Sequence, residues 1–215
     1  MCWQSGRLWL AMAVVAVGTS GDGVADDAAP GGRPVMRQLP PPAARELPPS
    51  ARQLVDARAE FRRRFRGPLS HVETAAGATR AAELMIESAV AEEDRGLKWV
   101  CLDEARRLGV QAGNAPVITR ATLLASAVYE FDALDTELRA LLEIPLRGLG
   151  PPRAAALAEA AEQLATRAEV DGRREVAIDA QRLAIRGWQR AGNDAAAVRA
   201  TQRHDQIEQD RVRQP

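Results

Sequence analysis

One short pattern occurs twice in this chain, and it constrains the fold more than any other feature. The segment Gln111–Asn114 returns as Arg190–Asn193, and in both places Arg-Ala-Thr follows after five residues. One constant offset separates the matched positions, which are Gly113 and Gly192, Asn114 and Asn193, and Arg120 and Arg199. Glycine just after a helix supports a left-handed turn, and asparagine caps the helix that follows. A fixed offset between such steps is typical of repeat proteins, so the sequence predicts two helical hairpins, at about 95–130 and 174–210.

The N-terminal segment, residues 1–25, has the pattern of an export signal. Arg7 is followed by an uncharged apolar run over residues 8–17 and then by small residues. That run is shorter than the roughly 20 apolar residues that a membrane-spanning helix needs. We therefore predict a signal peptide over 1–25, cleaved after Ala25 or alternatively after Gly18, and a protein exported to the periplasm or cell envelope. An uncleaved anchor and a buried N-terminal helix are the alternatives.

The rest of the chain divides by composition into a linker, one domain and a short tail. Residues 26–50 contain seven prolines among glycines and alanines, which favours an extended spacer because proline removes amide donors and fixes the backbone. A ligand for a proline-binding module is the alternative for this segment. Residues 51–211 have helical periodicity and are predicted to form a helical-repeat domain, followed by a tail over 212–215.

Composition limits which partners the protein can attract by charge and which interactions can stabilise its fold. The chain has 29 basic and 29 acidic residues, so no global field points to nucleic acid. Cys101 is the only cysteine after the predicted signal peptide, so no intramolecular disulfide is expected and hydrophobic packing must stabilise the domain. Aromatic residues make up 4% of the chain, and its many alanines favour closely packed helices.

The periodicity predicts an all-α fold without strands. Ser70 and Glu73 have the spacing of a capping box that opens a helix, although Gly77 weakens the start of that helix. Asp132–Asp135 is predicted to be a turn, and Pro145 should end the short helix after it. The expected architecture is antiparallel helical hairpins, stacked as a short solenoid similar to tetratricopeptide repeats (TPR-like) or as an irregular helical array.

Two resemblances support this architecture. Trp188, Gly192 and Ala197 have the spacing of the aromatic, glycine and small residue of a tetratricopeptide hairpin, whereas the earlier copy has Gly109 and Ile118 at the matched places. Residues 54–143 resemble an uncharacterised TPR-like helical region of exported planctomycete proteins. The segments that carry this resemblance are Asp94, Lys98–Leu102, Glu104-Ala105, Ala112–Asn114 and Phe131-Asp132. It implies a helical fold and an extracellular compartment, and it assigns no catalytic residue.

Few residues suggest chemistry, and each has a structural interpretation that we favour. Cys101 lies on the apolar stripe of its helix, where cysteine behaves as a small hydrophobic residue. His71 lies in the predicted first turn of a helix. His204 and Glu208 are four residues apart and could hold a metal, but two ligands are too few for a site. An acidic turn could coordinate calcium or simply begin a helix; its residues are Glu130, Asp132, Asp135 and Glu137. We expect no metal and no cofactor.

A basic segment offers one further surface. Its arginines alternate with Phe61 and Phe65, so it could lie on an anionic membrane or bind an acidic polymer. We favour the alternative in which the phenylalanines pack on the next helix and the arginines are solvated. The arginines of this possible basic surface are Arg58, Arg62, Arg63, Arg64 and Arg66.

The sequence thus favours a non-enzymatic helical-repeat protein that acts as a scaffold for another envelope protein or a peptide. Stacked helical hairpins present broad faces whose side chains are free to vary, and such arrays commonly bind peptides or proteins. The alternative is a periplasmic enzyme, or a protein that binds an anionic polymer, with its site in a cleft between helices.

Overall fold

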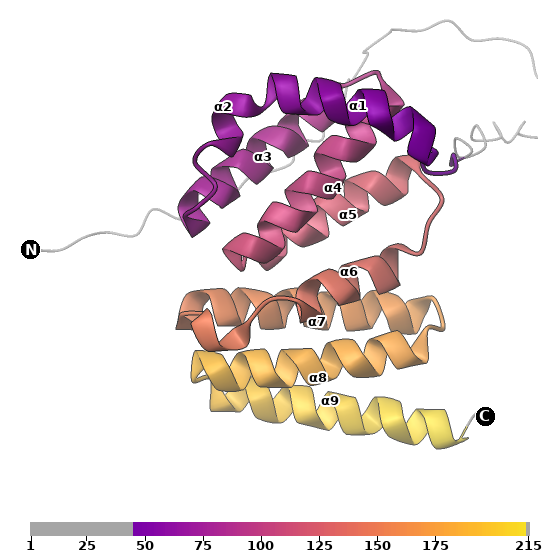
Figure 1. Cartoon of the computed structure of the whole chain (residues 1–215). Coiled ribbons are helices and arrows are strands. Elements are labelled where there is room, and N and C mark those ends of the chain that lie inside the picture. Colours follow the sequence, from indigo (N-terminus) through magenta and orange to yellow (C-terminus); the bar gives the residue numbers. More distant parts are fainter. Residues whose placement is uncertain (1–44, 214–215) are drawn as a thin grey trace, which may run out of the picture. The chain divides into compact units, whose positions relative to one another are not determined.

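A computed structural model describes residues 45–213, and the backbone there is helical between short connections (Figure 1). The predicted signal peptide, residues 26–44 of the linker, and residues 214–215 lie outside the described residues. The all-α prediction is confirmed for the described part. Its elements are α1 (Ala51–Arg64), α2 (Arg66–Leu69), α3 (Ala75–Ala91), α4 (Arg95–Ala112), α5 (Ala115–Val128), α6 (Ala133–Leu142), the 3₁₀ helix η1 (Leu146–Gly148), α7 (Pro151–Val170), α8 (Arg174–Ala191) and α9 (Asp194–Arg213).

The two Gly-Asn steps have the predicted conformation. Gly113 ends α4 with φ of 62°, and Gly192 ends α8 with φ of 72°. The side chain of Asn114 accepts a hydrogen bond from the Val117 amide at 3.3 Å, and that of Asn193 accepts one from the Ala196 amide at 3.1 Å. Both glycines therefore end a helix in the left-handed region, and both asparagines cap the next helix.

The repeat extends well beyond these hairpins. Ala91 and Val170, the last residues of α3 and α7, are separated by the same offset as Gly113 and Gly192. That offset also relates the first residues of α4 and α8, the last residues of these two helices, and the first residues of α5 and α9. Upstream, α1 corresponds to α6, and α2 corresponds to η1, with bounds that differ by a few residues. By the order and bounds of its helices, the described chain divides into two matched parts, at about 51–129 and 130–208, which we call the first and the second copy.

Burial follows the same offset. Each of the six buried residues of α3 has a buried counterpart in α7 at the matched position. In α4, six of the eight buried residues have buried counterparts in α8. Because burial is set by packing rather than by local propensity, this agreement shows that the two copies turn the same helical faces inward.

Two main hydrophobic cores correspond to the two copies, and α5 contributes to both. In the first copy, α1, α3, α4 and part of α5 enclose one core, and in the second copy α6, α7 and α8, with Ile207 of α9, enclose the other. A smaller cluster around Trp188 joins α7, α8 and α9. Val117 and Ala121 of α5 belong to the first core, whereas Ala115 and Ile118 belong to the second. The helices α7, α8 and α9 lie side by side in chain order (Figure 1).

A buried charge fixes the junction between the copies. Glu137 of α6 is fully buried and accepts two hydrogen bonds from Arg167 of α7, at 2.7 and 2.9 Å. The hydroxyl of Thr119 in α5 donates a third, at 2.8 Å. Three helices thus meet at one carboxylate whose charge is paired and hydrogen-bonded, which is the condition under which a buried charge is tolerated.

Two local predictions were wrong. The capping box does not form at Ser70 and Glu73, because Thr74 caps α3 by accepting a hydrogen bond from the Gly77 amide at 3.0 Å. Gly77 therefore lies inside the first turn. Asp132–Asp135 is not a turn but the start of α6. The favoured interpretation of these acids as a helix cap is confirmed, because Asp132 caps α6 by accepting from the Asp135 amide at 3.1 Å. Pro145 follows the end of that helix, as predicted.

Candidate binding cleft

An open cleft of about 810 Å³ lies in the first copy. One wall is α1, the opposite wall is the connection between α3 and α4 with the first turn of α4, and the segment before α1 covers one side. Its volume is within the range of ordinary ligand sites. Its lining residues are Glu46, Leu47, Pro49, Gln53, Asp56, Ala57, Glu60, Arg64, Glu92, Glu93, Asp94, Arg95, Gly96, Leu97 and Tyr129.

The segment before α1 is held in place by backbone pairing. The amide of Glu46 donates to the Val128 carbonyl at 3.0 Å, and the amide of Glu130 donates to the Glu46 carbonyl at 2.6 Å. These bonds form an isolated parallel bridge between Glu46 and Tyr129. The carboxylate of Glu46 also pairs with Arg95 at the start of α4. Residues that the composition assigns to the linker therefore form a wall of the cleft.

Tyr129 forms the floor and ties the cleft to the core. Its side chain is buried, and its hydroxyl donates to the Arg95 carbonyl at 2.6 Å. Burial raises the pKa of Tyr129 to about 12, so the phenol stays protonated and remains a donor. The ring packs edge-on against Trp99 at a centroid distance of 5.0 Å, and Phe131 packs on the same indole at 5.5 Å. The aromatic contacts fix the floor of the cleft.

Carboxylates outnumber guanidinium groups around the cleft. The lining contains six carboxylates and two arginines, and both arginines are paired, Arg64 with Glu92 and Arg95 with Glu46. Asp94 caps α4, and its side chain accepts from the Leu97 amide at 2.7 Å. Burial alone would raise the pKa of Glu92, but hydrogen bonds from the amide of residue 94, from Arg64 and from the amide of residue 93 together hold that pKa below its ordinary value. The cleft is therefore acidic at neutral pH.

The second copy is built differently at the corresponding place. Its α7 is followed by a left-handed residue, Gly172, with φ of 70°, where the first copy has Glu93. Arg173, which corresponds to Asp94, pairs with Asp132 of α6 at 2.8 Å, and Asp132 corresponds to Gln53 of α1. The hydrogen bond from Arg173 lowers the pKa of Asp132. A guanidinium group thus bridges α6 and the α7–α8 connection in the second copy. In the first copy Gln53 and Asp94 cannot form such an ion pair, and the bridge between α1 and the α3–α4 connection is made at a different place, by Arg64 and Glu92.

Cys101 lies in the core rather than at the cleft. It is fully buried in α4, and burial raises the pKa of its thiol to about 12. A thiol with so high a pKa is almost entirely protonated at neutral pH, and the thiolate is the reactive form. Cys101 is therefore a packing residue.

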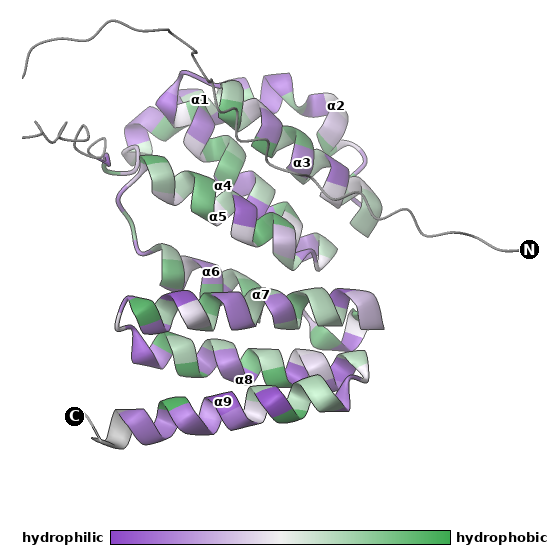
Figure 2. Cartoon of the chain, turned by 180° about the vertical axis from the view of Figure 1, so that it is seen from behind, coloured by the Kyte–Doolittle hydropathy of each residue, from purple (hydrophilic) through white to green (hydrophobic). Residues whose placement is uncertain are grey.

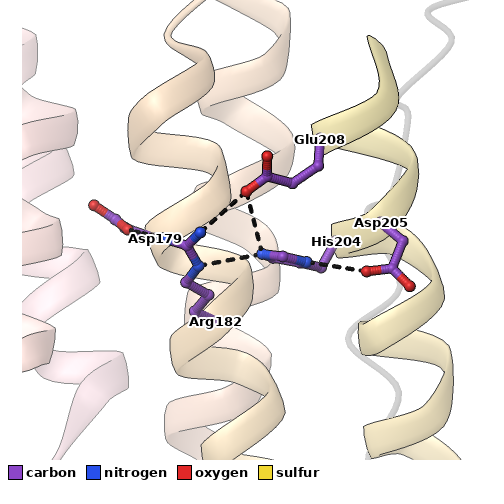
Figure 3. A network of polar contacts seen from close by, with 5 residues as sticks. All are labelled: Asp179, Arg182, His204, Asp205 and Glu208. Carbon is purple, nitrogen blue, oxygen red and sulfur yellow. Dashed lines mark hydrogen bonds and ion pairs between the residues drawn. The ribbon is translucent and has the colours of Figure 1, made fainter. Parts of the chain in front are cut away.

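His204 and Glu208 are part of a surface network between α8 and α9 (Figure 3). Arg182 of α8 donates to His204 Nε2 at 3.2 Å and to Glu208 at 3.0 Å, and it also pairs with Asp179 at 3.1 Å. Because His204 Nε2 accepts this bond, its Nδ1 carries the proton and faces Asp205 at 3.3 Å. The guanidinium of Arg182 thus occupies the place that a metal shared by His204 and Glu208 would need.

The predicted acidic turn is divided among separate partners. Asp132 pairs with Arg173, Asp135 pairs with Arg139, and Glu137 is buried against Arg167. Within residues 45–213, no three potential metal-ligating side chains gather into one group. The acids of this turn therefore cap and join helices. His71 lies in the connection between α2 and α3, where its backbone carbonyl closely approaches Gly77.

The basic segment is split between two environments. Phe61 and Phe65 are buried, with ring centroids 4.8 Å apart. Arg63 pairs with Glu60 of its own helix, and Arg64 points to the acidic cleft, where it pairs with Glu92. The exposed arginines of this segment are Arg58, Arg62, Arg63, Arg64 and Arg66.

The repeat residues serve as turns, caps and packing contacts. Trp188 of α8 packs against Ala158, Ala196 and Ala197 from the neighbouring helices, and its indole donates to Glu162 at 2.9 Å. Arg120 lines a second, smaller groove of about 410 Å³ between α5 and α7, whereas Arg199 is exposed on α9, which is largely hydrophilic along its length (Figure 2). The matched arginines therefore have different surroundings, because no described helix follows α9.

Sequence reasoning missed the cleft. Two clusters of acids, at residues 56–60 and 92–94, were visible in the sequence, but nothing local shows that α1 packs beside the α3–α4 connection. A comparison of the copies offers one signal. Asp94 stands where the second copy has Arg173, so the sign of the charge is reversed at a matched helix start.

Comparisons with known proteins identify no relative. No family model matches the chain, and neither the curated proteins nor the solved structures contain a match. Among the described helices, none combines the length and apolar character that crossing a bilayer requires.

Proposed function

We propose that this chain is an exported, non-enzymatic helical-repeat protein that binds another protein or a peptide of the cell envelope. The observation that carries the proposal is the cleft of the first copy, a hollow of about 810 Å³ between α1 and the α3–α4 connection. Arg64 and Glu92 bridge these two walls at one place and leave the cleft open, whereas Arg173 and Asp132 bridge the corresponding elements of the second copy. The first copy is then the binding unit and the second copy a supporting one.

Two further features support this proposal. The walls of the cleft are helices and a paired backbone segment, which are rigid elements that can hold a binding surface without reorganisation. The last helix, α9, is rich in charged and polar residues, as expected of a terminal repeat that faces solvent. We propose further that the two copies stack as a short TPR-like solenoid, in which Trp188 fills the space between helices.

The acidic lining argues against the alternative of an anionic-polymer site in the cleft, because a polyanion would meet an excess of carboxylates. The exposed arginines of α1 keep that alternative open for the outer surface of the first copy. A membrane contact through α1 is not favoured, because Phe61 and Phe65 are buried in the core and do not reach a lipid surface.

Site-specific photo-crosslinking in the cell that makes the protein tests the proposal. A photoreactive residue is placed at Leu47, which lines the cleft and is 78% exposed, and at Val170, which is 82% exposed and lies outside it. We expect a discrete crosslinked partner in the envelope fraction from position 47 and none from position 170. Equal crosslinking from both positions, or none from position 47, would contradict the proposal.

A further inference from the structure

We propose that the partner enters the cleft with positively charged side chains, as an extended segment rich in arginine or lysine. This inference rests on the proposed function and specifies the chemistry of the ligand. Three independent features lead to it: the charge of the lining, the counterpart of the cleft in the second copy, and the size of the hollow.

The negative charge is concentrated in the lining of the cleft rather than spread over the whole chain. The whole chain is neutral, with 29 basic and 29 acidic residues, yet the cleft has six carboxylates against two arginines. Asp56 lines the cleft from α1 and Glu93 lines it from the α3–α4 connection, and neither makes an ion pair within the described residues. A concave surface of one sign concentrates its field and attracts ligands of the opposite sign.

In the second copy, a positively charged side chain lies at the position that corresponds to the cleft. There, the guanidinium of Arg173 lies against Asp132, at 2.8 Å, between the helix and the connection that correspond to the two walls of the cleft. The first copy has Asp94 instead of that arginine, so a carboxylate stands where the second copy has an internal cation. In the first copy Arg64 of α1 already pairs with Glu92 of the α3–α4 connection. A guanidinium or ammonium group from a partner would add a further contact of this kind, with Asp56, Glu93 and Asp94 of the same lining.

The size of the cleft indicates a chain segment rather than a single ion. A volume of about 810 Å³ exceeds what one side chain fills. The described residues form no group of three metal ligands, so a metal ion is not the occupant that the lining favours. Leu47, exposed at the rim, can contact the aliphatic portion of an arginine or lysine side chain.

Binding of labelled hexa-arginine to the full-length chain tests this inference, with hexaglutamate as the control peptide. The cleft variant is Asp56→Asn with Glu93→Gln. The matched control is Glu83→Gln with Glu87→Gln, which removes the same charge from exposed positions of α3 outside the cleft. Thermal unfolding of both variants verifies that each is folded, and fluorescence anisotropy at low and at physiological ionic strength gives the affinities.

We expect the cleft variant to bind hexa-arginine about tenfold more weakly than the wild type, with the difference reduced by salt. The control variant should bind like the wild type, and hexaglutamate should not bind. Equal weakening in both variants, or no binding of hexa-arginine at low ionic strength, would overturn the inference. If the free polyamine spermine binds as tightly as the peptide, the assignment to a protein segment fails. Crosslinking from Leu47 is an independent measurement. A discrete partner found by crosslinking would therefore support the proposed function even if the peptide-binding experiment overturned this inference.

Discussion

At the residue scale, the two matched glycines have the same backbone conformation, but only Gly113 is crowded by a neighbouring side chain. Both have positive φ, but a Cβ on Gly113 would lie 2.6 Å from Leu149 Cδ2, whereas a Cβ on Gly192 would meet nothing within 4 Å. Leu149 is buried in the connection between η1 and α7, so it has little room to move. The same substitution is therefore expected to have unequal costs in the two copies.

We predict that Gly192→Ala lowers the free energy of unfolding by about 1 kcal/mol, the cost of placing an alanine in the left-handed region. Gly113→Ala should cost roughly 1–3 kcal/mol more, because overpacking is added to the same backbone strain. Chemical denaturation of the two variants measures the difference. Equal losses would show that Leu149 does not pack against Gly113.

Cys101 gives a second prediction at this scale. Because it is fully buried and its thiol pKa is raised to about 12, a thiol reagent should label it slowly in the native protein and rapidly in denaturant. Peptide mass spectrometry separates its label from that of Cys2. Cys101→Ala should cost roughly 1–2 kcal/mol of stability from lost burial and a small void, without weakening partner binding. Rapid native labelling would reveal a reactive role.

At the scale of elements, much of the helical pattern could be predicted, and the failures have physical causes. The Gly-Asn steps were readable because they combine two short-range signals, a left-handed glycine and a capping asparagine. The start of α3 was misplaced because Ser70 and Thr74 are both suitable caps, and Ser70 instead donates to the Gly67 carbonyl at the end of α2. Competition between nearby caps is decided by where the preceding chain packs.

The junction of α5, α6 and α7 could not be predicted, because its members come from three separate helices. Glu137 looked like one acid of a surface turn, but it is fully buried against Arg167 and Thr119. Sequence spacing places it near Asp135 along the chain and says nothing about Arg167, which lies on α7.

We predict that Arg167→Met destabilises the protein by about 3–5 kcal/mol, because it leaves the carboxylate of Glu137 buried without a counter-charge. Replacing both partners, as Glu137→Leu with Arg167→Met, should recover most of that loss, since apolar groups of similar volume can replace a buried ion pair. Thermal unfolding of the single and double variants tests this, with Arg63→Met as the control for an exposed pair. Additive losses in the double variant would contradict the role given to the pair.

At the scale of the whole molecule, the duplication explains both what could be predicted from the sequence and what could not. The repeated pattern around Gly113 and Gly192 was visible because turns tolerate few residue types, so they retain a signature. The full unit was hidden, because many matched core positions share burial without sharing the residue: Met85 corresponds to Leu164, and Leu108 to Gly187. The identical core pairs are alanines, such as Ala82 and Ala161, which carry little signal in a chain so rich in alanine. Helical packing needs a residue of suitable size and polarity, which leaves identity free.

The cleft belongs to this scale too. It forms where the two copies differ, with Asp94 in one and Arg173 in the other. The exchange of Asp94 for Arg173 can be recognised only after the two copies have been aligned residue by residue. That alignment follows from the bounds of the helices rather than from the short repeated motif.

A crystal structure of the full-length chain, with residues 51–129 superposed on residues 130–208, tests the duplication most directly. The expected result is that the best superposition places Gly192 on Gly113 and brings α6 onto α1. Asp94 should then coincide with Arg173, which pairs with Asp132 in the second copy only. A best superposition in another register, or a helix running unbroken through either Gly-Asn step, would contradict it.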